Sequence, residues 1–283
     1  MSNRNLSPTS FEITQKSGSN FYLSLFFLSR KKRQALATLY AFARLIDDIV
    51  DEPGSRSEKE KQLQFWKDEI GRCYGGRPES KLGLELVQSI QKYQLSSVYF
   101  FELIDGISTD LYKNQYATFE ELSRYCYGVA GTVGLLCMEL FGLRHERARD
   151  YAITLGRAFQ LTNILRDLAA DVAQNRFYLP EEDLKQFGYT AEDLRNHRDG
   201  EAFQRLIHFE VERADDCFQK AARLLKRVEK KKVLASLVMT AVYYRILKEL
   251  ARSPSRIFGE RISLSPLTKL TLAAKAWFQC QLA

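Results

Sequence analysis

Two pairs of carboxylates in this chain are spaced so that each could hold a metal ion from one face of a helix. Asp47 and Asp51 lie four residues apart in RLIDDIVDE, and Asp167 and Asp171 have the same spacing in NILRDLAAD. Residues four apart share a helix face, so each pair sets like charges side by side at a cost of roughly 0.2–0.5 kcal/mol. A bound cation would relieve that repulsion.

Each pair ends a longer polar stripe with helical spacing. The first stripe is Tyr40, Arg44, Asp47 and Asp51, and the second is Gln160, Asn163, Asp167 and Asp171 with Arg166 beside it. Leucines and isoleucines border both stripes, which is not the pattern of a solvent-facing helix. A single pair of this kind is usually a solvated surface. Two pairs in apolar surroundings favour a site, because buried charge must be paired or must bind metal.

The chemistry of the donors suggests which cation this is. Carboxylates without His or Cys select a hard cation such as Mg²⁺, which keeps several waters and is held by a few carboxylates together with substrate phosphates. A diphosphate bound in this way is a better leaving group, because the metal stabilises the charge that develops on it. If the carbon is allylic, a carbocation forms, and an apolar pocket can shelter it from water.

The elements that must position these residues are predicted to be helices throughout. Apolar residues recur at three- and four-residue spacings across residues 31–50, 122–142, 146–174, 206–228 and 233–251. The segment 122–142 contains several glycines and alanines, which would let a ligand or a second helix approach closely. No repeat and no long linker appears. We predict one all-α domain over residues 1–283, with residues 1–15 flexible.

Composition narrows the functional classes. The five cysteines and three histidines show no metal-ligand or disulfide spacing, which favours a cytoplasmic protein without zinc. No signal peptide or membrane span is predicted. The net charge of +7 is compatible with a solvated basic surface or with attraction to nucleic acid, a phosphorylated substrate or anionic lipid. The last segment, 267–283, is either a packed helix or an amphipathic helix at a membrane surface.

Four segments in order resemble the squalene/phytoene synthase family, and the resemblance runs from about Ser17 to Leu272. They are SGSNFYLSLFFL, YAFARLIDDIVDE, YCYGVAGTVG and LTNILRDLAADVAQNRFYLP. The family implies an all-α isoprenoid-synthase domain in which two aspartate-rich helices face a central cavity. The chain departs from the family pattern at Ala170, where an acidic residue is expected, and at Asn175, where glycine is usual.

The resemblance also implies roles for individual residues. Those expected to act in catalysis are Asp47, Asp51, Asp167, Asp171, Tyr40, Arg44 and Tyr243. Those expected to bind substrate are Ser17, Ser19, Phe21, Tyr125, Val129, Ala130, Gly134, Gln160, Asn163, Arg166 and Tyr178. Those expected to hold Mg²⁺ are Asp47, Asp51, Asn163, Asp167 and Asp171. Ordinary core packing is nearly as good an account of Phe21 and Tyr125.

The activity implied is head-to-head condensation of two farnesyl diphosphates to presqualene diphosphate, handed on to squalene-forming enzymes. This subfamily rests on KSGSNFYLSLFFLSRKKRQALATLYAFAR, ELIDGISTDLY and ERISLSPLTKLTLAAKAW. NADPH is not expected to be required. The alternatives are phytoene or dehydrosqualene synthase, squalene synthase if NADPH is used, and a non-catalytic helical binding protein. A nucleic-acid partner is not expected, whereas peripheral contact with a membrane, at its inner face, is.

Overall fold

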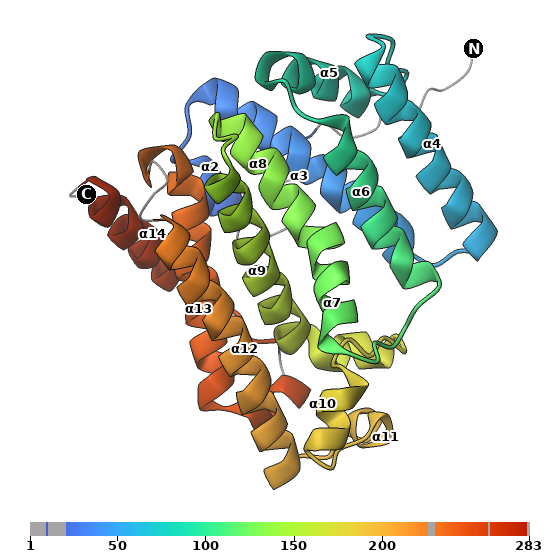
Figure 1. Ribbon diagram of the computed structural model, residues 1–283, viewed down its shortest axis with the longest axis vertical. Helices are drawn as coiled ribbons and strands as arrows, with labels where there is room; N and C mark the ends of the chain where they lie inside the picture. The colour runs from blue at the N-terminus through green and yellow to red at the C-terminus, as the bar shows by residue number, and fades with distance from the viewer. Residues whose placement is uncertain (1–9, 11–20, 226–229, 260, 282–283) are drawn as a thin grey trace.

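The chain folds almost entirely into helices, which the computed structural model describes for residue 10 and for residues 21–225, 230–259 and 261–281 (Figure 1). The main helices are α2 (Phe21–Leu25), α3 (Arg30–Asp51), α4 (Arg56–Tyr74), α5 (Lys81–Tyr93), α6 (Ser97–Ser108), α7 (Phe119–Cys126), α8 (Thr132–Phe141), α9 (Glu146–Ala173), α10 (Glu181–Gln186), α11 (Ala191–Arg195), α12 (Glu201–Leu225), α13 (Leu234–Arg252) and α14 (Pro266–Gln281). Short helical turns, η1 (Thr109–Leu111), η3 (Lys230–Val233) and η4 (Pro254–Phe258), join them. Within those ranges there is no strand, so the all-α prediction is confirmed.

Helix α9 is the central element of the bundle. It packs against α12, α8 and α13, and in Figure 1 α12, α13 and α14 lie on one side of it and α4, α5 and α6 on the other. Its first half is rich in small buried residues such as Ala148, Ala152 and Gly156, which let neighbouring helices come close. The two long helices that carry the predicted stripes, α3 and α9, end within two residues of the predicted boundaries.

The glycine-rich segment departs from the single helix predicted over 122–142. Between α7 and α8 the chain forms one π-helical turn, η2 (Tyr127–Gly131). Such turns are rare and occur often at functional sites. Close packing explains why small residues are needed here: a Cβ atom on Gly156 of α9 would lie 2.7 Å from the carbonyl oxygen of Ala130. The π-helical turn is therefore pressed directly against α9.

The C-terminal helix shows both features that its sequence left open. Helix α14 buries Ala273, Ala276 and Cys280 against Leu234 and Val238 of α13. Its other face exposes large apolar side chains, namely Leu267, Leu270, Trp277 and Phe278. Packing is thus confirmed for one face only.

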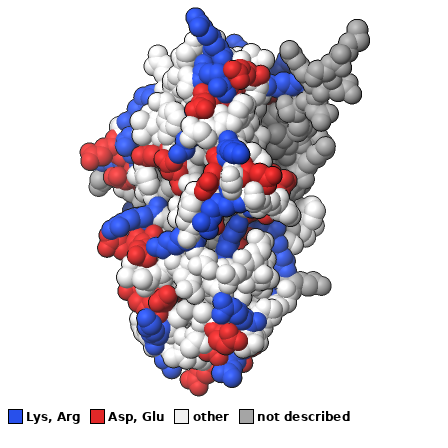
Figure 2. All heavy atoms as spheres, turned by 90° about the vertical axis from the view of Figure 1, so that its right-hand side faces the viewer, with Lys and Arg blue, Asp and Glu red and all other residues white. Residues whose placement is uncertain are grey.

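The surface carries mixed charge on the side formed by α4, α5 and α6. Figure 2 shows Lys and Arg interspersed there with Asp and Glu, as in the ion pair between Lys67 and Asp105, 2.5 Å apart. Such pairs add little stability at a surface. Among the described residues, no helix is both long enough and apolar enough to cross a bilayer.

Candidate active site

A cavity of about 800 Å³ runs between α3, α9, α13 and the segment from α7 to α8. Its two ends differ in chemistry. On α3 the apolar lining residues Leu36 and Leu39 precede Asp47 and Asp51, and on α9 Leu155 precedes the acidic residues in the same way. In both helices the apolar lining residues come first and the carboxylates lie near the C-terminal end. The cavity therefore has one apolar and one acidic end.

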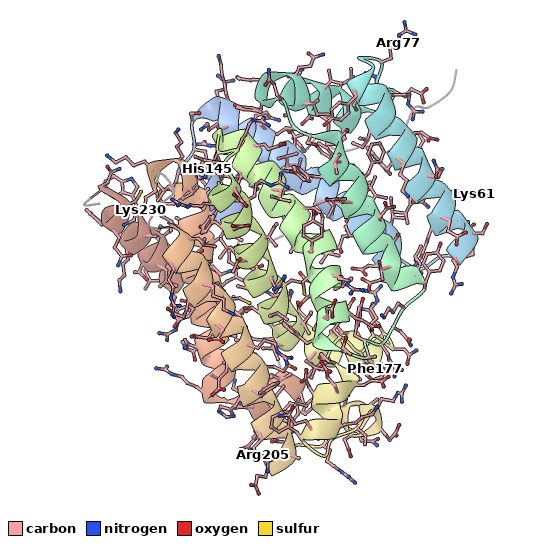
Figure 3. The ribbon with its side chains drawn as sticks, viewed as in Figure 1. Lys61, Arg77, His145, Phe177, Arg205 and Lys230 are labelled. Atoms are coloured by element: carbon pink, nitrogen blue, oxygen red, sulfur yellow. The ribbon has the colours of Figure 1, made fainter. Side chains whose placement is uncertain are left out.

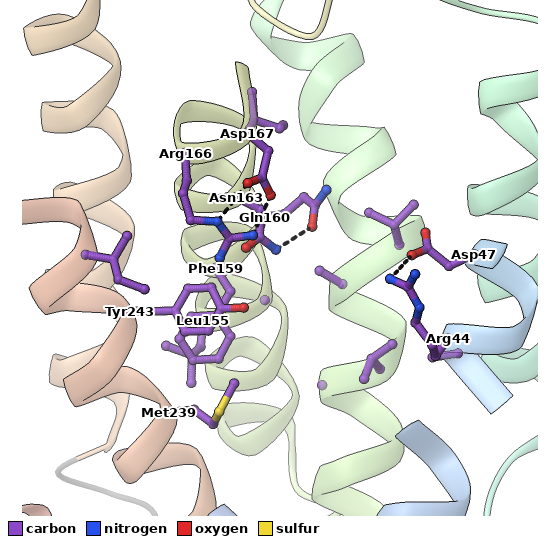
Figure 4. A pocket seen from close by; sticks show the side chains of 18 of the residues that line it. Arg44, Asp47, Leu155, Phe159, Gln160, Asn163, Arg166, Asp167, Met239 and Tyr243 are labelled. Atoms are coloured by element: carbon purple, nitrogen blue, oxygen red, sulfur yellow. Dashed lines mark hydrogen bonds and ion pairs between the residues drawn. The ribbon is translucent and has the colours of Figure 1, made fainter. Parts of the chain in front are cut away.

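Every predicted site residue whose side chain is described lies on the wall of this cavity. These residues are Tyr40, Arg44, Asp47, Asp51, Tyr125, Val129, Ala130, Gly134, Gln160, Asn163, Arg166, Asp167, Asp171, Tyr178 and Tyr243. Ser17 and Ser19 lie outside the described residues, as does the side chain of Phe21, the first residue of α2. Figure 4 shows Arg44 and Asp47 projecting from α3 toward the stripe of Gln160, Asn163 and Asp167 on α9. The two stripes thus face one another.

The carboxylates sit at the ends of helices where the backbone itself is negative. Asp51 is the last residue of α3, and Asp171 lies in the final turn of α9. Neither helix has a basic residue in its last turn. Since the C-terminal end of a helix carries a partial negative charge, a carboxylate there is unfavourable by roughly 0.3–1 kcal/mol. This arrangement lowers stability unless a cation compensates it.

Two of the four aspartates have strongly perturbed acidity. Burial raises the pKa of Asp47 to about 7, and the nearby charge of Asp51 adds to the effect. Burial likewise raises the pKa of Asp171 to about 7, with a further contribution from Asp167. The side chain of Asp47 is 47% exposed, because it faces the cavity, but the surrounding protein still desolvates it. Both carboxylates therefore lack enough positive charge around them.

Asp167 has the opposite character. Burial alone would raise its pKa, but hydrogen bonds from two arginines outweigh that effect and hold the pKa below its usual range. Arg166 donates from Nε to Oδ1 over 2.9 Å. Arg261, from the loop before α14, donates to Oδ1 over 2.7 Å and to Oδ2 over 3.1 Å.

Arg176 joins the ends of the two motif helices and was missed by the sequence analysis. Its Nη1 donates to Oδ1 of Asp51 over 2.6 Å. The backbone after α9 explains its position. Asn175 has φ 60°, Arg176 N–H donates to the Asp171 carbonyl over 2.9 Å, and Asn175 N–H donates to that of Val172 over 2.9 Å. This is a Schellman cap, and it accounts for Asn175, since asparagine tolerates the left-handed conformation that favours glycine.

Other lining residues were also missed. Asp110, Arg261 and Lys269 line the cavity. They come from a short turn, a loop and the first turns of α14, so no helical period relates them to the motifs. Only their place in the folded chain identifies them.

A metal ion at the acidic end would have to share its coordination with a ligand. Among the described residues, no group of three or more His, Cys, Asp or Glu side chains converges closely enough to hold a metal alone. The oxygen donors nevertheless suit Mg²⁺, which takes a few carboxylates together with waters and substrate phosphates. The amide oxygen of Asn163 is buried without a hydrogen-bond partner, while its amide group donates to Gln160 over 3.3 Å. An unpartnered buried oxygen beside undercompensated carboxylates fits a cation.

Comparison with known proteins identifies close relatives. The family model for squalene/phytoene synthase matches residues 14–268. The 15-cis-phytoene synthase of Synechococcus elongatus is 33% identical over 92% of this chain and 88% of its own length. The presqualene diphosphate synthase of Rhodopseudomonas palustris is 36% identical over 82% of this chain and 83% of its own.

Solved structures show the same fold. A dehydrosqualene synthase in complex with a ligand superposes with a TM-score of 0.85 and 25% identity, covering 97% of this chain and 96% of its own. A squalene synthase from Alicyclobacillus acidocaldarius has a TM-score of 0.79 and 30% identity, covering 86% of this chain and 94% of its own.

Proposed function

The chain belongs to the squalene/phytoene synthase family, whose members are prenyltransferases, and we propose that it condenses two farnesyl diphosphates head to head to presqualene diphosphate. The observation that carries the proposal is the pair of aspartate stripes on α3 and α9 that face each other at one end of an apolar cavity. With Mg²⁺ bound, the acidic end would suit two diphosphates, and the apolar end suits their hydrocarbon tails.

We assign the acidic end to Mg²⁺ and diphosphate. Asp47 and Asp51 would hold one group of ions, and Asp167 and Asp171 with Asn163 the other; bound Mg²⁺ would make diphosphate a better leaving group. Arg44, Arg166 and Arg176 line the cavity and would contact diphosphate oxygens, which guanidinium groups match geometrically.

The apolar walls would exclude water from the allylic cation. Val129, Ala130 and Gly134 come from the π-helical turn and the start of α8, and their small side chains leave room for isoprenoid tails. Tyr40 and Tyr243 would lie between the tails and the leaving group. The ring of Tyr243 packs against that of Phe159 at a tilt of 39°, with ring centroids 4.6 Å apart, so an aromatic surface borders the cavity where a cation would form.

Phytoene or dehydrosqualene synthase is the second candidate, and the comparisons support it equally. The relatives include 15-cis-phytoene synthases, and one similar structure is a dehydrosqualene synthase. A squalene synthase that uses NADPH is a third candidate, favoured by the similarity to the Alicyclobacillus enzyme. All three share the first condensation and differ in substrate length and in the fate of the cyclopropyl product.

A product assay distinguishes these candidates. Purified protein is incubated with Mg²⁺ and either farnesyl or geranylgeranyl diphosphate, with and without NADPH, and the products are analysed by mass spectrometry after phosphatase treatment. We expect presqualene alcohol from farnesyl diphosphate in both samples. Squalene only with NADPH, dehydrosqualene without it, or phytoene from the longer substrate would each replace the proposed product. No product from either substrate would contradict the family activity itself.

We also propose that the exposed face of α14 brings the enzyme to a membrane from the cytoplasmic side, where the product, with its long apolar tails, is handed to a squalene-forming enzyme. Leu267 and Phe278 are 71% and 59% exposed, and the net charge of +7 favours an anionic bilayer. Flotation with anionic liposomes at low salt should carry the wild type upward and leave the Leu267→Ser/Phe278→Ser variant behind. Equal flotation of the two would contradict a role for α14.

A further inference from the structure

Three side chains from separate segments meet at the acidic end of the cavity, outside the two aspartate motifs. Oδ2 of Asp110, in η1, accepts hydrogen bonds from the hydroxyls of Tyr125 in α7, over 2.8 Å, and of Tyr178 in the loop after α9, over 3.0 Å. The two phenol oxygens lie 3.2 Å apart. All three residues line the cavity. The other carboxylate oxygen, Oδ1, is buried without a hydrogen-bond partner.

A contact between two glycines sets the register of Asp110 and Tyr125. A Cβ atom on Gly106 of α6 would lie 2.6 Å from the carbonyl carbon of Gly128 in the π-helical turn, so only glycine permits this approach. Asp110 follows Gly106 by four residues and Tyr125 precedes Gly128 by three. Each is one helical turn from the contact, which therefore brings the carboxylate and the phenol together.

Tyr178 is brought to the pair by a second contact between loops. Phe177 N–H donates to the Asn114 carbonyl over 2.7 Å, in an isolated bridge between residues 115 and 177. Phe177, labelled in Figure 3, lies near the lower end of α7. The ring of Tyr178 stacks on Tyr125, with centroids 5.1 Å apart, and on Tyr116, 5.9 Å apart. Two rigid attachments thus hold the hydroxyls in place.

The surroundings leave Asp110 able to take up a proton near neutral pH. Burial raises the pKa of Asp110 to about 6, although the hydrogen bond from Tyr125 and the charge of Arg176 oppose the rise. The other charged or titratable groups that face it are Asp47, Asp51, Asp171, Tyr116 and Tyr178. A group with a pKa near the working pH is well suited to proton transfer.

We propose that Asp110 is a positioning residue that orients the Tyr125 and Tyr178 hydroxyls into the cavity and receives, through Tyr125, the proton released when the cyclopropane ring closes. This inference rests on the proposed function. The first new bond joins C1 of one substrate to C2 of the other and leaves a cation at C3. Ring closure forms the C1–C3 bond and breaks a C1–H bond.

The charges balance within the cluster. The proton from C1 passes to the phenol oxygen of Tyr125 as the Tyr125 hydroxyl proton passes to Oδ2 of Asp110. The carbocation and the carboxylate are both neutralised, which leaves a cyclopropyl product and a protonated Asp110. Tyr178 keeps its hydrogen bond to Asp110 and holds the carboxylate in place.

The decisive substitution is Asp110→Asn, which keeps an oxygen to accept both hydrogen bonds but cannot take a proton. We expect kcat with the substrate the wild type uses to fall by about 100-fold or more, the usual range for proton transfer, with KM little changed. The matched control is Asp105→Asn, the same substitution on α6 at an exposed position, which should keep the wild-type rate. Circular dichroism and the melting temperature establish that both variants are folded.

A substrate deuterated at C1 separates proton transfer from a merely structural role. If the slow step of Asp110→Asn is loss of the C1 proton, the variant shows a primary isotope effect on kcat that is larger than that of the wild type. A variant with wild-type kcat, or a slow variant without that isotope effect, would overturn the inference.

A second variant keeps the inference testable if Asp110→Asn does not fold. Tyr125→Phe keeps the ring contacts but removes the hydroxyl, and it should show the same loss and the same isotope effect; a wild-type rate would again overturn the inference. If the wild type itself converts no prenyl diphosphate, the proposed function fails. If instead the wild type is active and Asp110→Asn is equally active, only the inference about Asp110 fails.

Discussion

The two aspartate motifs have the same spacing but different electrostatic surroundings. On α9, Asp167 is held by Arg166 beside it and by Arg261 from the loop before α14. On α3, the one basic partner of Asp47 among the described residues is Arg44, 3.4 Å away, and that arginine also pairs with Asp48 over 2.5 Å. Asp51 is paired with Arg176, which reaches it from the loop just after the C-terminal end of α9.

This difference shows that a repeated motif need not make two equivalent sites. The charge of Asp167 is already compensated by protein cations, whereas Asp47 and Asp171 are left with pKa values raised to about 7. We therefore expect a bound cation to be needed most at one aspartate of each motif, namely Asp47 and Asp171. Substitutions at these two positions test whether the motifs bind metal or only form ion pairs.

The largest expected effect is on turnover after Asp47→Asn or Asp171→Asn. Either variant removes a carboxylate that would hold Mg²⁺ at the diphosphate, and losing one electrostatic contact of this kind costs about 10²–10³ in kcat. Steady-state kinetics with excess Mg²⁺ measure this loss, and circular dichroism should show an unchanged helical content.

The control for that prediction is Asp48→Asn. Asp48 follows Asp47 on the same helix but is absent from the cavity wall, so this variant should keep a rate close to that of the wild type. A rate near wild type for Asp47→Asn would contradict the assignment of the first motif to metal.

The arginines should differ in their effect on stability. Arg176→Gln removes a cation whose side chain is 16% exposed, and we expect the free energy of unfolding to fall by roughly 1–3 kcal/mol, as for loss of a hydrogen bond to a charged group. Arg261→Gln removes a side chain that is 68% exposed and leaves Arg166 on Asp167, so the loss should be below about 1 kcal/mol. Urea unfolding of the metal-free proteins measures both losses. A larger loss for Arg261→Gln than for Arg176→Gln would mean that the second motif depends on Arg261 more than the first depends on Arg176.

The smallest expected effect is a pH dependence of stability without metal. Because burial raises the pKa of Asp171 from its ordinary value of 3.8 to about 7 in the folded state, the folded chain keeps a proton that the unfolded chain has lost. Stability should then fall as pH rises between about 4 and 7. Melting temperatures from pH 5 to pH 8 should decline, and less steeply for Asp171→Asn.

Two comparisons isolate that contribution. Glu210, whose pKa is also raised by burial, changes stability in the same direction in both proteins and cancels in their difference. Mg²⁺ with diphosphate should raise the melting temperature of the wild type at pH 8 more than that of Asp171→Asn. Parallel pH profiles for the two proteins would show that Asp171 is not the undercompensated group.

The sequence alone determined that the chain is all-α, where α3 and α9 begin and end, and which residues form the two stripes. Period and spacing along a helix are local properties, so the bounds of α3 and α9 and the shared face of Asp167 and Asp171 follow from residues a few positions apart. The resemblance to a family added Tyr125, Tyr178 and Tyr243, which belong to no local pattern with the aspartates.

Only the tertiary structure decided which other groups meet these residues. Arg176 reaches Asp51 because Asn175 turns the chain back after α9, and Asp110 reaches Tyr125 because Gly106 and Gly128 allow two segments to touch. The same is true of the acidity of the aspartates. Burial and partners from distant segments fix a pKa, so two motifs with one spacing acquire different charges once the chain is folded.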